Sequence, residues 1–165
     1  MSMLRWFVVC LLVFAVPTGG FAMIATYTLD ELTIRSEIIA YGMLKEAKDA
    51  GKEEDGLKKL ENIIEIADVL KGENLKGKTV AIPTITGLED QPEFAPRVKY
   101  LLFLKKIGEG SYETVNFLQG AWPVDPSGMF SGLGLGVTPD QLKRSIEATR
   151  GKAPPADEVA PEPEF

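Results

Sequence analysis

The sequence predicts a mainly β fold, a small OB-like barrel or sandwich with a short N-terminal helix and a C-terminal helix. Stretches rich in apolar, β-branched and aromatic residues recur between positions 36 and 124, as strands require. Segments that contain glycine and proline separate these stretches, and the two clearest helix-start patterns lie outside them. A closed barrel pairs its own edges, which suits a domain that has no cysteine after position 10.

Five stretches are expected to form the principal strands. They cover residues 36–44, 60–70, 79–85, 98–104 and 111–118, and residues 121–124 extend the sheet. The stretch 60–70 also fits a helix through Leu60, Ile63 and Ile64, but the β-rich segments around it favour a strand. The charged segment 45–59 predicts a solvated loop or a hairpin tip, and the glycine-rich segment 127–136 predicts a loop.

Individual glycine and proline residues predict further details of this sheet. Gly42 lies within the first strand, which predicts a bulge or a close backbone approach. Pro83 lacks an N–H group for a strand ladder, so its strand is expected at an edge. Gly108 and Gly110 flank Glu109 between two strands and predict a hairpin connection.

Two capping boxes place the helices. Thr28 and Glu31 have the required spacing, a hydroxyl followed three residues later by a carboxylate. Thr138 and Gln141 repeat the pattern, with a proline at the first helical position. These patterns predict helices over 29–35 and 138–150.

The first 22 residues read as a signal peptide. Arg5 supplies the positive charge, residues 6–16 are apolar, and Ala22 ends a pattern of small residues that predicts cleavage before Met23. We therefore expect three parts and a periplasmic or extracellular location. The parts are a signal peptide over 1–22, a β-rich globular domain over 23–151, and a disordered acidic, proline-rich tail over 152–165. The alternative is an uncleaved leader that anchors the protein in a membrane.

Charge and composition exclude several classes of partner. The chain has 18 basic and 24 acidic residues, and such an acidic protein is poorly suited to bind nucleic acid phosphates. It contains no histidine, the commonest general base and transition-metal ligand. We expect no metal, no cofactor and no nucleic acid, and membrane contact only if the leader is retained.

One segment imitates a phosphate-binding loop. Residues 72–79 match the pattern G-x-x-x-x-G-K-[ST] at every required position. That chemistry also needs a helix that begins at the loop and directs its N-terminus at the phosphates. Residues 80–85 instead have strand composition and include Pro83, which fits poorly inside a helix. The sequence therefore predicts a turn between two strands and no nucleotide binding.

No catalytic residue is assigned. The serines have no histidine partner and no G-x-S-x-G motif is present, which leaves a carboxylate pair or a Ser–Lys pair as the enzymatic alternative. Under that alternative Glu89, Asp90 and Lys71 are the first residues to mutate. The candidate partner surface is Lys71, Trp122 and Phe130, since exposed aromatic residues anchor partners. The competing interpretation of Trp122 and Phe130 is packing in the core or in a loop.

Several short motifs carry a family resemblance. Residues 36–39 (SEII) lead to a glycine-bearing strand, residues 69–72 (VLKG) end another, and residues 100–104 (YLLFL) form a later one. This layout, over about residues 28–123, resembles the OB-fold of netrin-like modules and tissue inhibitors of metalloproteinases. Those inhibitors act through an N-terminal cysteine, which the predicted mature chain lacks. The resemblance therefore implies a fold and transfers no functional residue.

These observations lead to one functional hypothesis and two alternatives. The chain is expected to be an exported, non-enzymatic binding or envelope-associated module whose partner is a protein or envelope component. The first alternative is a structural protein tethered to a membrane through an uncleaved leader. The second is a hydrolase that depends on carboxylates or on a Ser–Lys pair.

Overall fold

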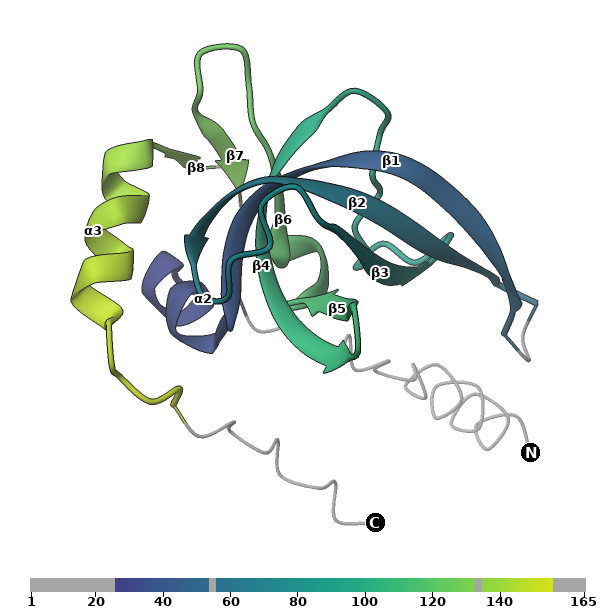
Figure 1. Cartoon of the computed structure of the whole chain (residues 1–165), viewed down its shortest axis with the longest axis horizontal. Coiled ribbons are helices and arrows are strands. Elements are labelled where there is room, and N and C mark those ends of the chain that lie inside the picture. Colours follow the sequence, from purple (N-terminus) through teal and green to yellow (C-terminus); the bar gives the residue numbers. More distant parts are fainter. Residues whose placement is uncertain (1–25, 54–55, 133–134, 156–165) are drawn as a thin grey trace, which may run out of the picture.

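The computed structural model describes residues 26–53, 56–132 and 135–155 and confirms the mainly β prediction (Figure 1). Five strands close into a small barrel in the order β1-β2-β3-β5-β4, and β4 pairs with β1 to complete it. This arrangement is compatible with an OB-like fold. The predicted signal peptide, and the predicted tail beyond residue 155, lie outside the described residues.

Eight strands, two α-helices and one 3-10 turn make up the described part of the chain. In chain order they are α2 (Leu29–Arg35), β1 (Ile38–Lys52), β2 (Lys58–Lys71), β3 (Thr79–Ile85), β4 (Lys99–Gly108), β5 (Ser111–Thr114), the 3-10 turn η1 (Phe117–Gly120), β6 (Ala121–Pro123), β7 (Phe130–Gly132), β8 (Leu135–Val137) and α3 (Pro139–Thr149). Both predicted capping boxes are present, at Thr28 with Glu31 and at Thr138 with Gln141.

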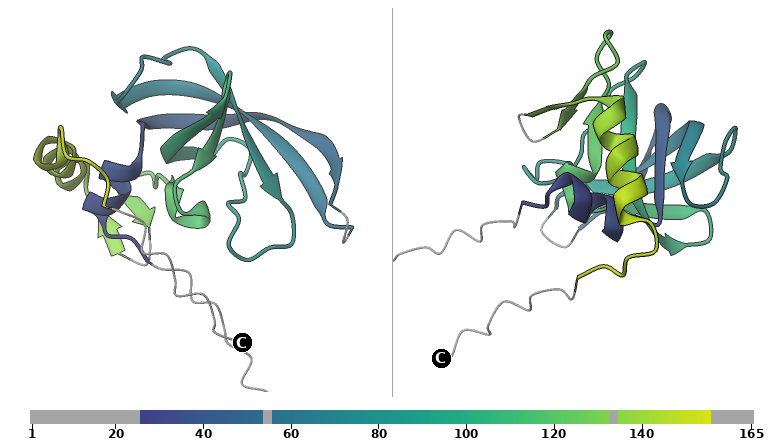
Figure 2. Two further views of the ribbon diagram at one scale, coloured as in Figure 1. Left: turned by 90° about the horizontal axis from the view of Figure 1, so that it is seen from below. Right: turned by 90° about the vertical axis from the view of Figure 1, so that its left-hand side faces the viewer.

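Strand β4 is the centre of the molecule because both of its faces are buried. Leu102 and Leu104 belong to the cluster that fills the barrel, together with apolar residues of β1, β2 and β3. Leu101 and Phe103 point to the other side and pack with residues of the two helices, β6 and β7. Helices α2 and α3 lie side by side against this outer face, as Figures 1 and 2 show.

Of the two predictions for residues 45–59, a solvated loop or a hairpin tip, the structure bears out the hairpin, although its strands extend further than expected. Strand β1 continues to Lys52 and β2 begins at Lys58, so most of this segment is a long two-stranded ribbon that projects away from the helices (Figure 1). Charged side chains on neighbouring strands pair across it, for example Lys58 Nζ with an Asp49 carboxylate oxygen at 3.2 Å. A two-stranded ribbon exposes both faces, so its strands carry charges instead of the apolar alternation that marks a half-buried strand.

The predicted strand 111–118 is shorter in the structure. Strand β5 ends at Thr114, and the chain then turns through Asn116 and Phe117 into η1. The predicted loop over 127–136 was also wrong in part, because it contains β7 and, after a gap in the described residues, the start of β8. A side chain at Gly132 would overlap the ring of Trp122, since an added Cβ would lie 2.1 Å from its Cε2 atom.

The prediction from Gly42 is confirmed, whereas the prediction from Pro83 is right only in part, because β3 lies between β2 and β5 and not at a sheet edge. The β1–β2 register shifts between Tyr41 and Gly42, and a Cβ added at Gly42 would lie 2.5 Å from Cγ2 of Ile64. Strand β3 pairs with β2 along its whole length, but its other edge pairs with β5 only where Ala81 faces Ser111. Pro83 lies beyond that pair, where the barrel is open.

Candidate binding groove

Two adjoining cavities lie where the barrel opens, and Phe117 lines both. The first has a volume of about 460 Å³ and lies between Tyr27, Arg35 at the end of α2, strand β5 and the segment after α3. The second, of about 310 Å³, lies between the β1–β2 ribbon, the end of β3 and the β4–β5 hairpin. They also share Glu113 and Thr114. We call the second cavity the hairpin groove and the first the Arg35 cavity.

The backbone turn after β5 brings Phe117 to the surface. Asn116 and Phe117 have φ angles of 53° and 52°, in the left-handed region that residues other than glycine rarely adopt. Asparagine tolerates this conformation, whereas a phenylalanine there costs on the order of 1–3 kcal/mol. The Phe117 side chain is nevertheless 47% exposed, so core packing does not explain why the chain holds it there.

Partly buried hydrogen bonds and close packing hold this strained turn. The side-chain oxygen of Gln119 accepts hydrogen bonds from the Tyr27 backbone N–H at 2.9 Å and from Asn116 Nδ2 at 2.7 Å. The Leu118 backbone N–H donates to the Asp90 carbonyl at 2.7 Å. A Cβ added at Gly120 would lie 2.6 Å from the Val115 carbonyl oxygen. These contacts hold the turn that presents the Phe117 ring.

The hairpin groove has an apolar lining and paired charges near its rim. Leu60, Pro83, Ile85 and Ile107 contribute carbon surface next to Phe117, and Ile107 is 49% exposed. Lys59 Nζ lies 2.7 Å from a Glu53 carboxylate oxygen. Volumes of this size and lining are typical of sites that bind small ligands or peptide side chains.

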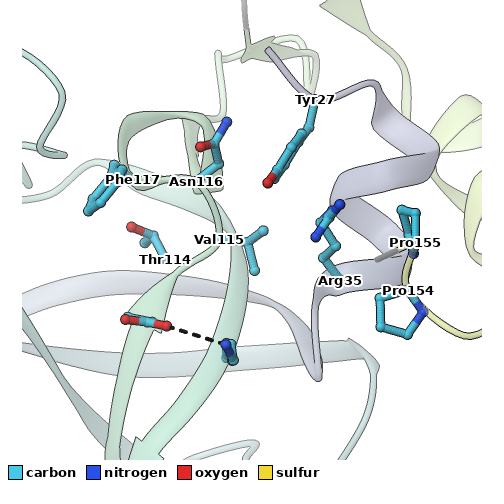
Figure 3. A pocket seen from close by; sticks show the side chains of 10 residues that line it. Tyr27, Arg35, Thr114, Val115, Asn116, Phe117, Pro154 and Pro155 are labelled. Atoms are coloured by element: carbon cyan, nitrogen blue, oxygen red, sulfur yellow. Dashed lines mark ion pairs between the residues drawn. The ribbon is translucent and has the colours of Figure 1, made fainter. Parts of the chain in front are cut away.

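The Arg35 cavity is more polar. Its walls include Arg35, Lys105 and Glu113, and Lys105 Nζ lies 3.9 Å from a Glu113 carboxylate oxygen. The Arg35 guanidinium stacks over the Tyr27 ring at 4.5 Å from its centroid. Figure 3 shows Tyr27 and Arg35 on one side of this cavity and Asn116 and Phe117 on the other.

The candidate partner surface of Lys71, Trp122 and Phe130 does not form. Trp122 is 3% exposed and Phe130 is 0% exposed, so both rings belong to the core, as the competing interpretation held. The Trp122 ring packs on Phe103 with a centroid separation of 5.0 Å. Trp122 fills the space above Gly132, a close packing that composition alone does not reveal.

Lys71 has a structural role. Its Nζ donates to the carbonyl oxygens of Thr33 at 2.6 Å and Ser36 at 2.7 Å, so it ties the end of α2 to β2. Partial burial lowers the pKa of Lys71 from its ordinary 10.5. These contacts use the ammonium group to satisfy carbonyls at a helix end, where cations are favourable.

The residues of the enzymatic alternative are not brought together. Glu89 lines a third cavity beside Leu88 and Tyr100. The backbone carbonyl of Asp90 accepts a hydrogen bond from the Leu118 N–H. Lys71 lines a different hollow, at the end of β2. The buried Ser145 donates from Oγ to an Asp30 carboxylate oxygen, and its Oγ also lies within hydrogen-bond distance of the Thr33 hydroxyl, so it joins α3 to α2.

The segment that imitates a phosphate-binding loop is a turn, as predicted. Thr79 begins strand β3, so no helix starts where the nucleotide chemistry requires one. The Gly77 backbone N–H and the Lys78 carbonyl both bond to Ile66 and fold the turn back onto β2. In the part of the chain that the structure describes, no group of three or more acidic, cysteine or histidine side chains is placed to hold a metal ion.

No family model matches the chain, and no curated protein is significantly similar to it. Within residues 26–53, 56–132 and 135–155, no helix has the length and apolar character to cross a bilayer.

Proposed function

We propose that this protein is an exported, non-enzymatic binding module whose partner, a protein or envelope component, lies in the hairpin groove against Phe117. The observation that carries the proposal is the exposed Phe117 ring, presented on a strained turn that hydrogen bonds and close packing support. Backbone strain at an exposed residue is a typical sign of function, because stability alone would select glycine or asparagine there.

The position of the groove supports a binding role. OB-fold proteins bind their ligands on the face of strands 2 and 3, between the loops that join strands 1–2 and 4–5. The hairpin groove lies between the corresponding β1–β2 ribbon and β4–β5 hairpin. This is an analogy of fold, and the chemistry of the groove has to supply the specificity.

The groove residues favour a partner that offers an apolar side chain. Phe117 and Ile107 are each about half exposed, so a partner that covers both removes a substantial apolar area from water. Full burial of one such side chain is worth about 1.5–3 kcal/mol, so covering the exposed halves of two gives a similar total. Aromatic residues at the centre of a contact commonly dominate its affinity.

Site-specific photo-crosslinking during export tests this proposal. A benzophenone amino acid at position 117 is expected to capture one reproducible partner, which mass spectrometry identifies. The matched control is the same probe at Met43, which is 42% exposed on β1 but does not line the groove. The identified partner should bind the purified protein, and Phe117→Ala should weaken binding about 5- to 30-fold. Capture that is equal at positions 43 and 117 would contradict the proposal.

Export is part of the same proposal. Mass spectrometry of the purified protein is expected to find an N-terminus at Met23. A protein that retains residues 1–22 and stays in the membrane fraction would instead support the tethered alternative.

The finer resemblance to netrin-like modules is likewise a proposal, and it concerns fold alone. The five-stranded barrel supports it at that level. Because no functional residue of the metalloproteinase inhibitors has a counterpart in the predicted mature chain, we do not extend the proposal to protease inhibition.

A further inference from the structure

Exposed apolar side chains gather at one end of the barrel. Among the residues that the structure describes, the large apolar side chains that are more than a third exposed are Met43, Leu88, Ile107, Phe117 and Leu118. All but Met43, which lies on β1, line either the hairpin groove or the third cavity. Single apolar side chains scattered over a surface are normal, whereas a concentration of them indicates a site of interaction.

The hairpin groove and the third cavity adjoin each other. Gln91 lines both, and the third cavity has a volume of about 370 Å³. Phe117 lines the groove, and the next residue, Leu118, lines the third cavity. The hydrogen bond from the Leu118 N–H to the Asp90 carbonyl, at 2.7 Å, joins this turn to the loop that carries Gln91. An extended segment that crosses here can place one apolar side chain in each hollow, because alternate side chains of a strand face the same side.

The lining of the third cavity is acidic. Glu89 and Glu93 line it, and both are exposed. Within the described part of the chain, no ion pair involves either carboxylate. The two carboxylates of the hairpin groove are instead each paired with a lysine. The charge that the surface leaves unpaired is therefore negative, and it lies beside the apolar side chains.

Tyr100 holds the loop that carries these carboxylates. Its hydroxyl accepts a hydrogen bond from the Ala95 N–H at 2.8 Å and donates one to the Glu93 carbonyl at 3.3 Å. The Phe94 ring packs edge to face on the Tyr100 ring, with 5.2 Å between the centroids. These contacts give the loop a defined conformation, which reduces the entropy that a partner's binding costs.

We propose that the partner presents a basic and apolar protein segment to this surface. One apolar side chain lies in the hairpin groove against Phe117, a second lies beside Leu118, and lysine or arginine side chains lie over Glu89 and Glu93. This inference rests on the proposed function and specifies its partner as a cationic segment. Charge complementarity of this kind speeds encounter and selects against acidic partners.

Peptide selection followed by binding measurements tests this inference. A displayed library of short random peptides is selected against the purified full chain. The recovered peptides are expected to combine lysine or arginine with an aromatic or aliphatic residue. A synthetic peptide of the recovered consensus, labelled with fluorescein, is then titrated with the wild type and with each variant, and fluorescence anisotropy gives the affinity.

The variants remove the charge and the apolar contact separately. Glu89→Gln combined with Glu93→Gln should weaken peptide binding about 3- to 10-fold and reduce its salt dependence, because salt screens exposed charges. Leu118→Ala should weaken binding several-fold through lost apolar contact. The matched control is Glu65→Gln combined with Glu73→Gln, which removes two exposed carboxylates that line neither hollow. The control should change the affinity less than about 2-fold, because charges beyond a Debye length are screened.

Three outcomes would overturn the inference. One is a selection that recovers no enriched peptide, and another is a consensus without basic residues. The third is equal weakening by the two double variants, which would show attraction to the net charge of the protein instead of to this surface.

The same titration separates this inference from the proposed function. Peptide binding that weakens with Phe117→Ala but is unchanged by the loss of Glu89 and Glu93 would reject the basic segment and retain the groove. Binding that depends on Glu89 and Glu93 but not on Phe117 would contradict the proposed function and support a basic segment at the third cavity alone.

Discussion

The two sides of the barrel differ in how far they bury large aromatic side chains. On the helix side, Phe103 is 0% exposed and packs against Trp122, with α2 and α3 covering the sheet. At the open end, Phe117 is 47% exposed on a backbone that phenylalanine rarely adopts. Phe103 is fully buried, whereas Phe117 is half exposed and has a strained backbone conformation. The difference indicates that the helix side maintains the fold and that the open end is available for contact.

The largest expected effect is on the helix side. Phe103→Ala should lower the free energy of unfolding by about 3–5 kcal/mol, because it removes a fully buried ring and leaves a cavity beside Trp122. Phe117→Ala, the matched change at the open end, should alter it by less than about 1 kcal/mol. Urea denaturation measures both. Similar losses in the two variants would remove the contrast between the two sides.

A smaller loss is expected inside the barrel. Gly42→Ala places a Cβ 2.5 Å from Ile64 Cγ2 and 3.3 Å from the Glu65 carbonyl oxygen, in a region without free space. The overlap should cost about 1–3 kcal/mol of unfolding free energy. Gly108→Ala is the control, since its added Cβ meets nothing closer than Ser111 Cβ at 3.7 Å. If denaturation shows equal stability for the two variants, the barrel interior is looser than described.

The Lys71 contact connects the helix side to the barrel and adds a pH dependence. Lys71→Met removes the donor to the Thr33 and Ser36 carbonyls and should cost about 1 kcal/mol after allowing for partial exposure. Lys78→Met, at an exposed turn, should cost less than about 0.5 kcal/mol. Denaturation at neutral pH compares them.

The sign of the pH effect follows from burial, which lowers the pKa of Lys71 from 10.5 in the folded state. Just below pH 10.5 the unfolded chain therefore binds more protons than the folded one, and stability rises with pH through that interval. The stability of the wild type relative to Lys71→Met should thus increase as the pH approaches 10.5. Tyr41, whose pKa burial raises, is present in both proteins and cancels in this difference. A decreasing difference would contradict the burial argument.

The fold was largely predictable because its signals are local. The capping boxes at Thr28 and Thr138 place both helices, and β3 was predicted with its observed bounds. The ribbon of β1 and β2 was missed in part, because strands that are exposed on both faces carry no apolar alternation. Strand β5 was predicted to be too long, because Val115 and Phe117 continue its apolar alternation past the point where the backbone turns.

The candidate site was much less predictable. Trp122 and Phe130 attracted attention as aromatic residues in segments that read as loops, yet tertiary packing against Phe103 and Gly132 buries them. Phe117 was assigned to a strand face, and its exposure depends on the left-handed turn at Asn116. Asn116 and Gly120 are the local signals that could have indicated a turn there. The groove itself joins β2, β3, β4 and β5, and no single-sequence pattern brings those segments together.

Phe117→Gly tests the central claim most directly, because glycine removes the ring and also relieves the left-handed backbone. The measurement is the free energy of unfolding alongside the affinity for the partner that position 117 captures. We predict an unfolding free energy that is unchanged or raised by up to about 1 kcal/mol. We predict affinity that falls at least about tenfold, which corresponds to about 1.4 kcal/mol. A variant that loses more than about 1 kcal/mol of stability while binding the partner normally would show that Phe117 serves the fold and would contradict the account.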